Sequence, residues 1–143
     1  MPEILHDFPV FATPERVFAA LSDPAGLDAW WSLRASGTPG PGAHYALDFG
    51  PGYAWAGVVV AYDPPRALAW EMVEADDDWR GTRVGFELAA IEGGTHVAFA
   101  HTGWPAANAH FRTSSFCWAM YLRLFKRYVE AGEVVPYARR LDV

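Results

Sequence analysis

The stretch that decides the fold is ATPERVFAALSDPAGLDAWW, residues 12–31. It contains two helix starts in succession. Thr13-Pro14-Glu15 supplies a capping hydroxyl, a proline for the first helical position and an acidic side chain in the first turn. Asp23-Pro24 repeats the capping residue and the proline. The stretch therefore predicts two short helices joined at a bend, the second of which carries Trp30 and Trp31.

Segments of β-type composition lie on both sides of this helical pair. The segment from Ile4 to Ala12 is predicted to be an edge strand, because Pro9 has no N–H to donate to a ladder. Alternating apolar residues and intervening turn residues predict five more strands, at about 44–49, 53–62, 67–73, 81–90 and 95–103. Because short turns join these five strands, they should form an antiparallel meander.

The spacing of apolar residues becomes helical from about Ala107 to Ala131, and Gly132 follows as a C-terminal cap. One helix cannot cover both faces of a six-stranded sheet. We therefore predict an α+β fold in which a strongly curved antiparallel sheet of about six strands grips the long C-terminal helix. We expect a single domain over residues 1–132, followed by a tail over 133–143. The space between sheet and helix would hold an apolar ligand unless side chains fill it.

The composition argues against several classes of protein. The formal net charge is −6 and no basic run is present, so nucleic-acid binding lacks its electrostatic signature. No secretory signal and no apolar run of membrane-spanning length is visible, which favours a cytoplasmic protein without a membrane span. No spacing predicts a metal site or a phosphate-binding loop, and no cofactor is expected. The acidic run Asp76-Asp77-Asp78 is interpreted as a solvated connection rather than a cation site.

Several motifs resemble a known superfamily. They are ATPERVFAALSDP at 12–24 with the later Trp30-Trp31, DPPRAL at 63–68, GTHV at 94–97 and HTGW at 101–104. The chain resembles the START-like helix-grip superfamily, also called SRPBCC, as far as Gly132. Within it, the chain is similar to the branch of the C-terminal domain of heat-shock chaperone ATPase activators. The resemblance implies the helix-grip fold, but its members include lipid and steroid carriers, polyketide aromatase/cyclases, receptors and co-chaperones.

Aromatic residues make up 15% of the chain, more than a minimal core needs. Those on the predicted inner faces, with their apolar neighbours, are our candidate ligand-binding residues: Trp30, Trp31, Tyr45, Phe49, Trp55, Trp70, Phe86, Phe99, His101, Trp118, Tyr121, Leu122 and Phe125. Trp30 and Trp31 either plug the end of the core or gate the mouth of a cavity. Trp55 faces inward only if its strand keeps the expected register, because a slip of one residue turns it outward.

His101 and Tyr121 are the candidate catalytic residues. His101 shares strand parity with Phe99, so it should point inward, and its titration range suits acid–base work. We consider Thr102, Tyr121 and Glu71 as its hydrogen-bond partners, although Glu71 has the parity of the solvent face. A buried histidine with a satisfied hydrogen bond and no further role is the competing interpretation.

Three hypotheses of function remain open. The first is a carrier or sensor that binds a small apolar molecule, aromatic or lipid-like, in an internal cavity. The second is an aromatase/cyclase-like enzyme in which His101 and Tyr121 handle protons. The third is a ligand-free, co-chaperone-like interaction module whose aromatic residues fill the core. We favour binding over catalysis because the sequence shows no paired acid and base. An exposed edge strand would also permit a homodimer.

Overall fold

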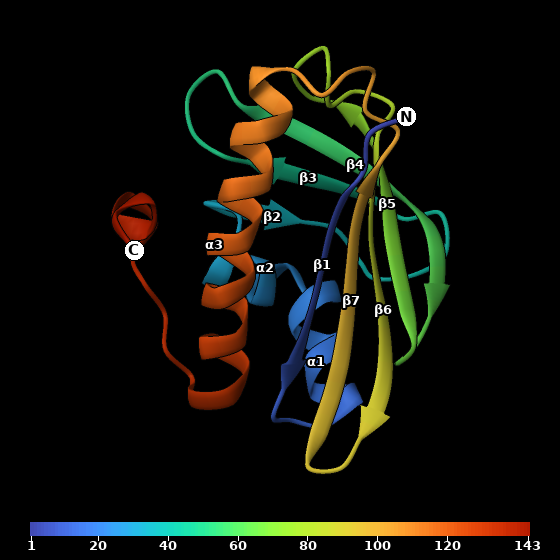
Figure 1. Ribbon diagram of the computed structural model, residues 1–143, viewed down its shortest axis with the longest axis vertical. Helices are drawn as coiled ribbons and strands as arrows, with labels where there is room; N and C mark the ends of the chain where they lie inside the picture. Colours follow the sequence, from blue (N-terminus) through green and yellow to red (C-terminus); the bar gives the residue numbers. More distant parts are fainter.

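The computed structural model describes residues 1–143 as one seven-stranded sheet with helices (Figure 1). Its elements, in chain order, are β1 (Ile4–Val10), α1 (Pro14–Ser22), α2 (Pro24–Trp30), β2 (Arg34–Ser36), β3 (His44–Asp48), β4 (Ala54–Asp63), β5 (Ala67–Glu74), β6 (Arg83–Ile91), β7 (Gly94–Thr102), α3 (Ala109–Ala131) and the 3-10 helix η1 (Tyr137–Asp142). The α+β class and the long C-terminal helix are confirmed. The predicted count of about six strands is wrong by one.

The additional strand is β2, which has only three residues and pairs with β3 in antiparallel register. Three residues are too few for alternation to be recognised in a sequence. Only residues 31–33 separate the strand from the end of α2. Asp28 of α2 holds the entry to the strand: its Oδ1 accepts hydrogen bonds from the Ser32 hydroxyl at 2.6 Å and from the Ala35 N–H at 2.7 Å.

The two helix starts form as their sequence predicts. The Thr13 side chain accepts the Arg16 N–H at 3.3 Å, and the Asp23 side chain accepts the Ala25 N–H at 3.2 Å. A proline occupies the first turn of each helix. Because the α1–α2 bend is tight, the Trp30 indole N–H reaches back to the Ala20 carbonyl at 3.1 Å. Trp30 is fully buried as a result.

The strand order in the sheet is β1-β7-β6-β5-β4-β3-β2, and every neighbouring pair is antiparallel. The strands from β3 to β7 therefore form the predicted meander, which β2 extends at one edge. Leu47 of β3 lies opposite Trp55 of β4. Since directly opposed residues share a face and Leu47 is fully buried, Trp55 lies on the inner face, as the expected register requires.

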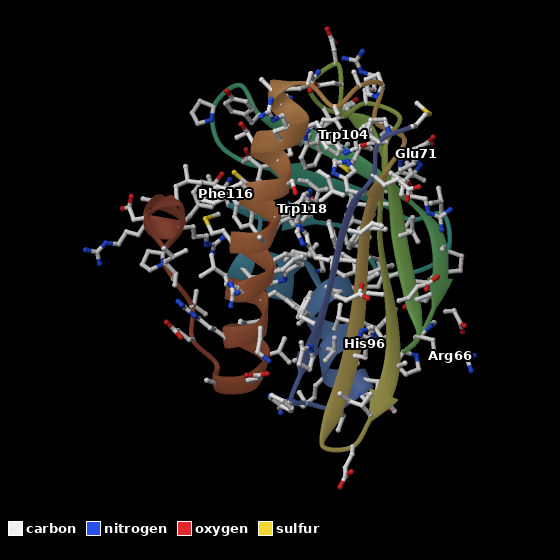
Figure 2. The ribbon with its side chains drawn as sticks, in the orientation of Figure 1. Arg66, Glu71, His96, Trp104, Phe116 and Trp118 are labelled. Carbon is white, nitrogen blue, oxygen red and sulfur yellow. The ribbon has the colours of Figure 1, made fainter.

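Helix α3 runs along one face of the sheet (Figure 1). The Asn108 side chain caps its start by accepting the Phe111 N–H at 2.9 Å, and Gly132 ends it in the left-handed conformation at φ 69°. Trp118 is buried against the sheet, whereas Phe116 is 81% exposed. Figure 2 shows Phe116 on the side of α3 that faces away from the sheet.

The residues after Gly132 pack back onto the molecule. The guanidinium of Arg140, which is only 3% exposed, donates to the carbonyl oxygens of Val135, Ser32 and Asp28 at 3.0, 3.2 and 2.7 Å. Two of these carbonyls belong to the C-terminal end of α2 and the turn after it, where unpaired carbonyls attract a cation. Arg140 thus fixes η1 beside α3, on the side away from β1 and β7 (Figure 1).

Candidate functional site

Aromatic rings fill the middle of the space between α3 and the sheet. Ring centroids are 4.6 Å apart for Phe99 and Trp118, 5.0 Å for Trp30 and Phe125, and 5.2 Å for Trp31 and Trp118. These separations are typical of aromatic pairs in direct contact, so no ligand fits between them. Along this part of α3 the apolar core is closed.

A hollow of about 390 Å³ remains beside the first half of α3 and opens to solvent. Its wall combines one face of α3 with the β3–β4 turn, the 76–79 segment and the C-terminal residues. Ten of its fourteen lining residues are hydrophobic: the lining consists of Trp31, Phe49, Tyr53, Trp55, Asp76, Trp79, His110, Thr113, Ser114, Cys117, Trp118, Tyr121, Tyr137 and Leu141. We call this hollow the α3 pocket.

The structure brings five of the thirteen candidate binding residues to the α3 pocket: Trp31, Phe49, Trp55, Trp118 and Tyr121. The other eight lie in the packed core, each at most 3% exposed: Trp30, Tyr45, Trp70, Phe86, Phe99, His101, Leu122 and Phe125. The two predicted roles of the tryptophan pair, plugging the core and lining the mouth of a cavity, therefore belong to different residues. Trp30 plugs the core, and Trp31 lines the pocket while its ring contacts Trp118 and Phe49.

His101 points inward, as its strand parity predicts, and is fully buried. Its Nδ1 accepts the Trp118 indole N–H at 3.1 Å, so the ring proton resides on Nε2. That Nε2–H donates to Thr82 Oγ1 at 2.8 Å, and the Thr82 hydroxyl in turn donates to the Trp79 carbonyl at 2.6 Å. Every polar atom of this chain of hydrogen bonds has a partner within the protein.

This network corrects the expected partners of His101. Thr102 lies on the outer face of the sheet, Glu71 is exposed, and Tyr121 makes no hydrogen bond with the imidazole. Burial, with a smaller contribution from His110, lowers the pKa of His101 to about 3. A neutral imidazole with both nitrogens occupied positions Trp118 and Thr82, and it has no free atom with which to handle a substrate proton.

Trp79 is a pocket residue that sequence analysis missed. It follows the acidic run in a connection between strands, where no periodicity marks a residue as buried, yet it is only 7% exposed. Its indole N–H donates to Ser114 Oγ at 3.2 Å, and its ring stacks on Trp118 with centroids 6.0 Å apart. These contacts fold the 76–82 connection against α3 and close one side of the pocket.

The structure also contains a paired acid and base that sequence analysis did not find. His110, in the first turn of α3, lines the pocket, and its Nδ1 lies 2.7 Å from Asp78 Oδ1. Since a carboxylate only accepts, Nδ1 carries a proton, and in the neutral ring Nε2 is therefore an acceptor. Asp78, interpreted from sequence as part of a solvated run, is held in place by the Asn108 side chain, whose Nδ2 donates to Oδ2 at 3.4 Å.

Two groups at the other end of the pocket keep their protons at neutral pH. Burial raises the pKa of Tyr121 to about 12, and burial also raises the pKa of the Cys117 thiol. No protein group accepts the Tyr121 hydroxyl, which is therefore available to a ligand as a donor. The Tyr137 hydroxyl, by contrast, donates to the Phe49 carbonyl at 2.8 Å and joins the C-terminal residues to the β3–β4 turn.

The sequence matches the family described as Activator of Hsp90 ATPase homolog 1-like protein over residues 11–130. The chain belongs to this family. The match spans α1 to the last turn of α3 and confirms the branch of the superfamily that the motifs resemble. No functionally curated protein matches the chain significantly.

Solved structures similar to this family member support the same fold. The solution structure of the Aha1 dimer from Colwellia psychrerythraea has 28% sequence identity and a TM-score of 0.84, and the match covers 93% of this chain and 99% of that one. CalU16 from Micromonospora echinospora has 19% identity and a TM-score of 0.76, with 98% and 81% covered. Protein MLL2253 from Mesorhizobium loti has 18% identity and a TM-score of 0.80, with 93% and 100% covered.

A second hollow, of about 470 Å³, lies on the outer face of the sheet in this family member. Six of its fourteen lining residues are Ala or Gly, among them Ala69, Gly85 and Ala100, and only two are aromatic, against eight in the α3 pocket. No group of three or more His, Cys, Asp or Glu side chains is arranged to hold a metal ion. None of the helices is both long and apolar enough to cross a membrane.

Proposed function

We propose that this protein binds a small apolar, aromatic molecule in the α3 pocket, as a carrier or a sensor. The observation that carries the proposal is the pocket wall, in which eight of fourteen residues are Trp, Tyr or Phe. Aromatic faces attract planar apolar ligands, and a volume of about 390 Å³ is near the lower end of the range found for small-molecule sites.

The distribution of polar groups supports the same proposal. Polar side chains enter the pocket at few points, chiefly His110 at one end of its α3 wall and the Tyr121 hydroxyl at the other. They are eleven positions apart in the helix, or about 16 Å along the axis. An apolar wall with a few fixed polar groups is the usual composition of a site that orients an organic molecule.

The C-terminal residues are part of the proposed site. Tyr137 and Leu141 line the pocket, and Arg140 holds them there through the carbonyls of Asp28 in α2 and Ser32 in the turn after it. We propose that residues 133–143 form a wall of the ligand site and follow the domain of residues 1–132 as a functional extension of it.

The proposal is tested by calorimetric titration with naphthalene and by a matched pair of variants at Cys117. Cys117→Phe adds a ring to the pocket wall, whereas Cys117→Ser keeps the space open. We expect Cys117→Phe to weaken naphthalene binding about tenfold or more, the effect of losing roughly 1.4 kcal/mol of contact, and Cys117→Ser to change it less than about threefold. Equal affinities for the two variants, or no binding to the unmodified protein, would contradict the proposal and favour the ligand-free interaction module.

Cys117 provides an independent measurement, because it is the only cysteine in the chain. Bound naphthalene should protect the thiol from alkylation by iodoacetamide in proportion to occupancy. Alkylation at an unchanged rate at saturating naphthalene would place the probe elsewhere on the protein.

A second candidate function is an acid–base enzyme of the aromatase/cyclase kind. The observation that supports it is that the pocket holds both a histidine paired with a carboxylate, His110 with Asp78, and the free hydroxyl of Tyr121. In this version His110 replaces His101 as the base. Turnover of a carbonyl-containing aromatic precursor, abolished by His110→Phe while naphthalene still binds, would establish the enzyme over the carrier.

A further inference from the structure

The His110 side chain offers the α3 pocket a fixed hydrogen-bond acceptor. Its Nδ1–H is engaged by Asp78 at 2.7 Å, and its Nε2 has no partner within the protein. In the neutral imidazole the carboxylate sets the tautomer, because Nδ1 donates to Asp78 and Nε2 then carries the lone pair. The side chain is 37% exposed, so this lone pair is open to a ligand.

The ring is also held in orientation. Its centroid lies 5.8 Å from that of Trp104, edge-on at 85°, and 6.3 Å from that of Trp79. Asn108 caps α3 and also donates to the second oxygen of Asp78, which ties the carboxylate to the helix start. Figure 2 shows Trp104 close to this end of α3. Because Asp78, Trp79 and Trp104 hold the imidazole in one orientation, Nε2 favours ligands whose donor group lies in the matching position.

The surrounding charge limits the kind of ligand that this acceptor fits. Asp76 lines the pocket and Asp78 lies behind the imidazole, in a chain of net charge −6. Carboxylate or phosphate ligands would meet these negative charges at close range and are disfavoured. A neutral molecule with a good O–H donor is not disfavoured in this way. Because the pocket wall is aromatic, the hydroxyl should belong to a planar apolar molecule.

We propose that His110 Nε2 accepts the hydroxyl of a phenol-type aromatic molecule, positioned by Asp78, and that the α3 pocket thereby selects hydroxylated over unsubstituted aromatic ligands. The inference rests on the proposed function, since it names the ligand class of the same pocket. His110 contacts the ligand, and Asp78 acts through His110 by fixing the tautomer and the ring orientation.

The test compares 2-naphthol with naphthalene by calorimetric titration in the unmodified protein and in His110→Phe, which keeps a ring against Trp79 and Trp104. The measured quantity is the ratio of the two dissociation constants in each protein. When this ratio is compared between the two proteins, the difference in hydrophobicity between the probes cancels. We expect the preference for 2-naphthol to fall about tenfold in His110→Phe, the effect of one hydrogen bond, whatever change the variant makes to the apolar contact that the two probes share.

A matched control uses the other histidine–aspartate pair of the chain. His96 Nε2 lies 3.8 Å from Asp7 Oδ2 on β7 and β1, and Figure 2 shows His96 near the end of the sheet opposite Trp104. His96→Phe should leave the preference unchanged. Asp78→Asn, which retains an acceptor for Nδ1–H but loses the charge, should reduce the preference by a smaller factor than His110→Phe.

The outcomes separate the inference from the proposed function. If naphthalene binds and the preference for 2-naphthol is the same in the unmodified protein and His110→Phe, the inference is overturned and the pocket proposal stands. If His110→Phe weakens both probes equally, His110 only shapes the wall, and the inference is likewise overturned. If neither probe binds the unmodified protein, both fail.

Discussion

Thr82 is the residue at which the described hydrogen-bond network can be tested most directly. It is fully buried, its Oγ1 accepts the His101 Nε2–H at 2.8 Å, and its hydroxyl donates to the Trp79 carbonyl at 2.6 Å. Replacement by valine keeps the shape of the side chain and puts a methyl group in place of the hydroxyl. Neither tautomer of His101 then has partners for both nitrogens, because Nδ1 must accept from Trp118 and a proton on Nε2 has no acceptor.

The cost follows from counting these groups. An unpaired buried N–H costs about 1–3 kcal/mol, and the lost hydroxyl–carbonyl bond contributes about 1 kcal/mol. The Trp79 carbonyl is not orphaned, because it still accepts the Thr82 backbone N–H at 3.0 Å. We therefore expect Thr82→Val to lower the free energy of unfolding by about 2–4 kcal/mol. Thr82→Ser keeps the hydroxyl and loses one methyl group, for about 1 kcal/mol.

Urea unfolding at neutral pH, followed by tryptophan fluorescence, measures both variants. The reasoning requires that the serine variant be more stable than the valine variant with an unchanged dependence on denaturant. Burial alone predicts the opposite order, because valine is the more apolar residue. A valine variant at least as stable as the serine variant would show that Oγ1 does not satisfy a buried imidazole.

Two further predictions concern pH and the C-terminal residues. Burial lowers the pKa of His101 from 6.5 to about 3. Between these pH values the imidazole is protonated in the unfolded chain but not in the folded protein, so the stability present above pH 6.5 should be lost as the pH falls toward 3. This one group should contribute up to about 1.4 kcal/mol per pH unit to the slope of the free energy of unfolding against pH. Urea unfolding of His101→Gln at several pH values should show a slope that is smaller by this amount. Arg140→Met keeps the apolar stem but loses three hydrogen bonds to carbonyls, so chymotrypsin should cleave after Tyr137 at least tenfold faster, and an unchanged cleavage rate would contradict the anchoring role of Arg140.

Those features of the fold that depend on local chemistry were predictable from the sequence. Thr13 and Asp23 cap helices because their side chains reach N–H groups two or three residues away, and Gly132 ends α3 because it adopts a positive φ without strain. The meander followed from short turns between alternating segments. In each case the decisive interaction lies within a few residues of the chain, where sequence order and spatial proximity coincide.

The features that were missed depend on contacts between distant segments. Arginine is usually found at the surface. The burial of Arg140 depends on hydrogen bonds to carbonyl groups more than a hundred residues earlier in the chain, which the local sequence does not reveal. His110 and Asp78 are 32 residues apart, and an acidic run gives no sign that its last member faces a histidine. The absence of a paired acid and base, on which the preference for binding over catalysis rested, was therefore a limit of sequence order and not a property of the site.

The position of the pocket has a simpler origin, in the sizes of the side chains along α3. In the second half of the helix, Leu122 and Phe125 are large and meet Trp30 and other rings, so the space between helix and sheet is filled. In the first half, the pocket-lining face carries Thr113 and Cys117, whose short side chains leave the hollow unfilled, and Ser114, whose Oγ accepts the Trp79 indole N–H. Once α3 is known to cover the sheet, this change from small to large residues predicts a hollow at its N-terminal half. It also predicts that enlarging a small residue there closes the pocket, which is the change that Cys117→Phe makes.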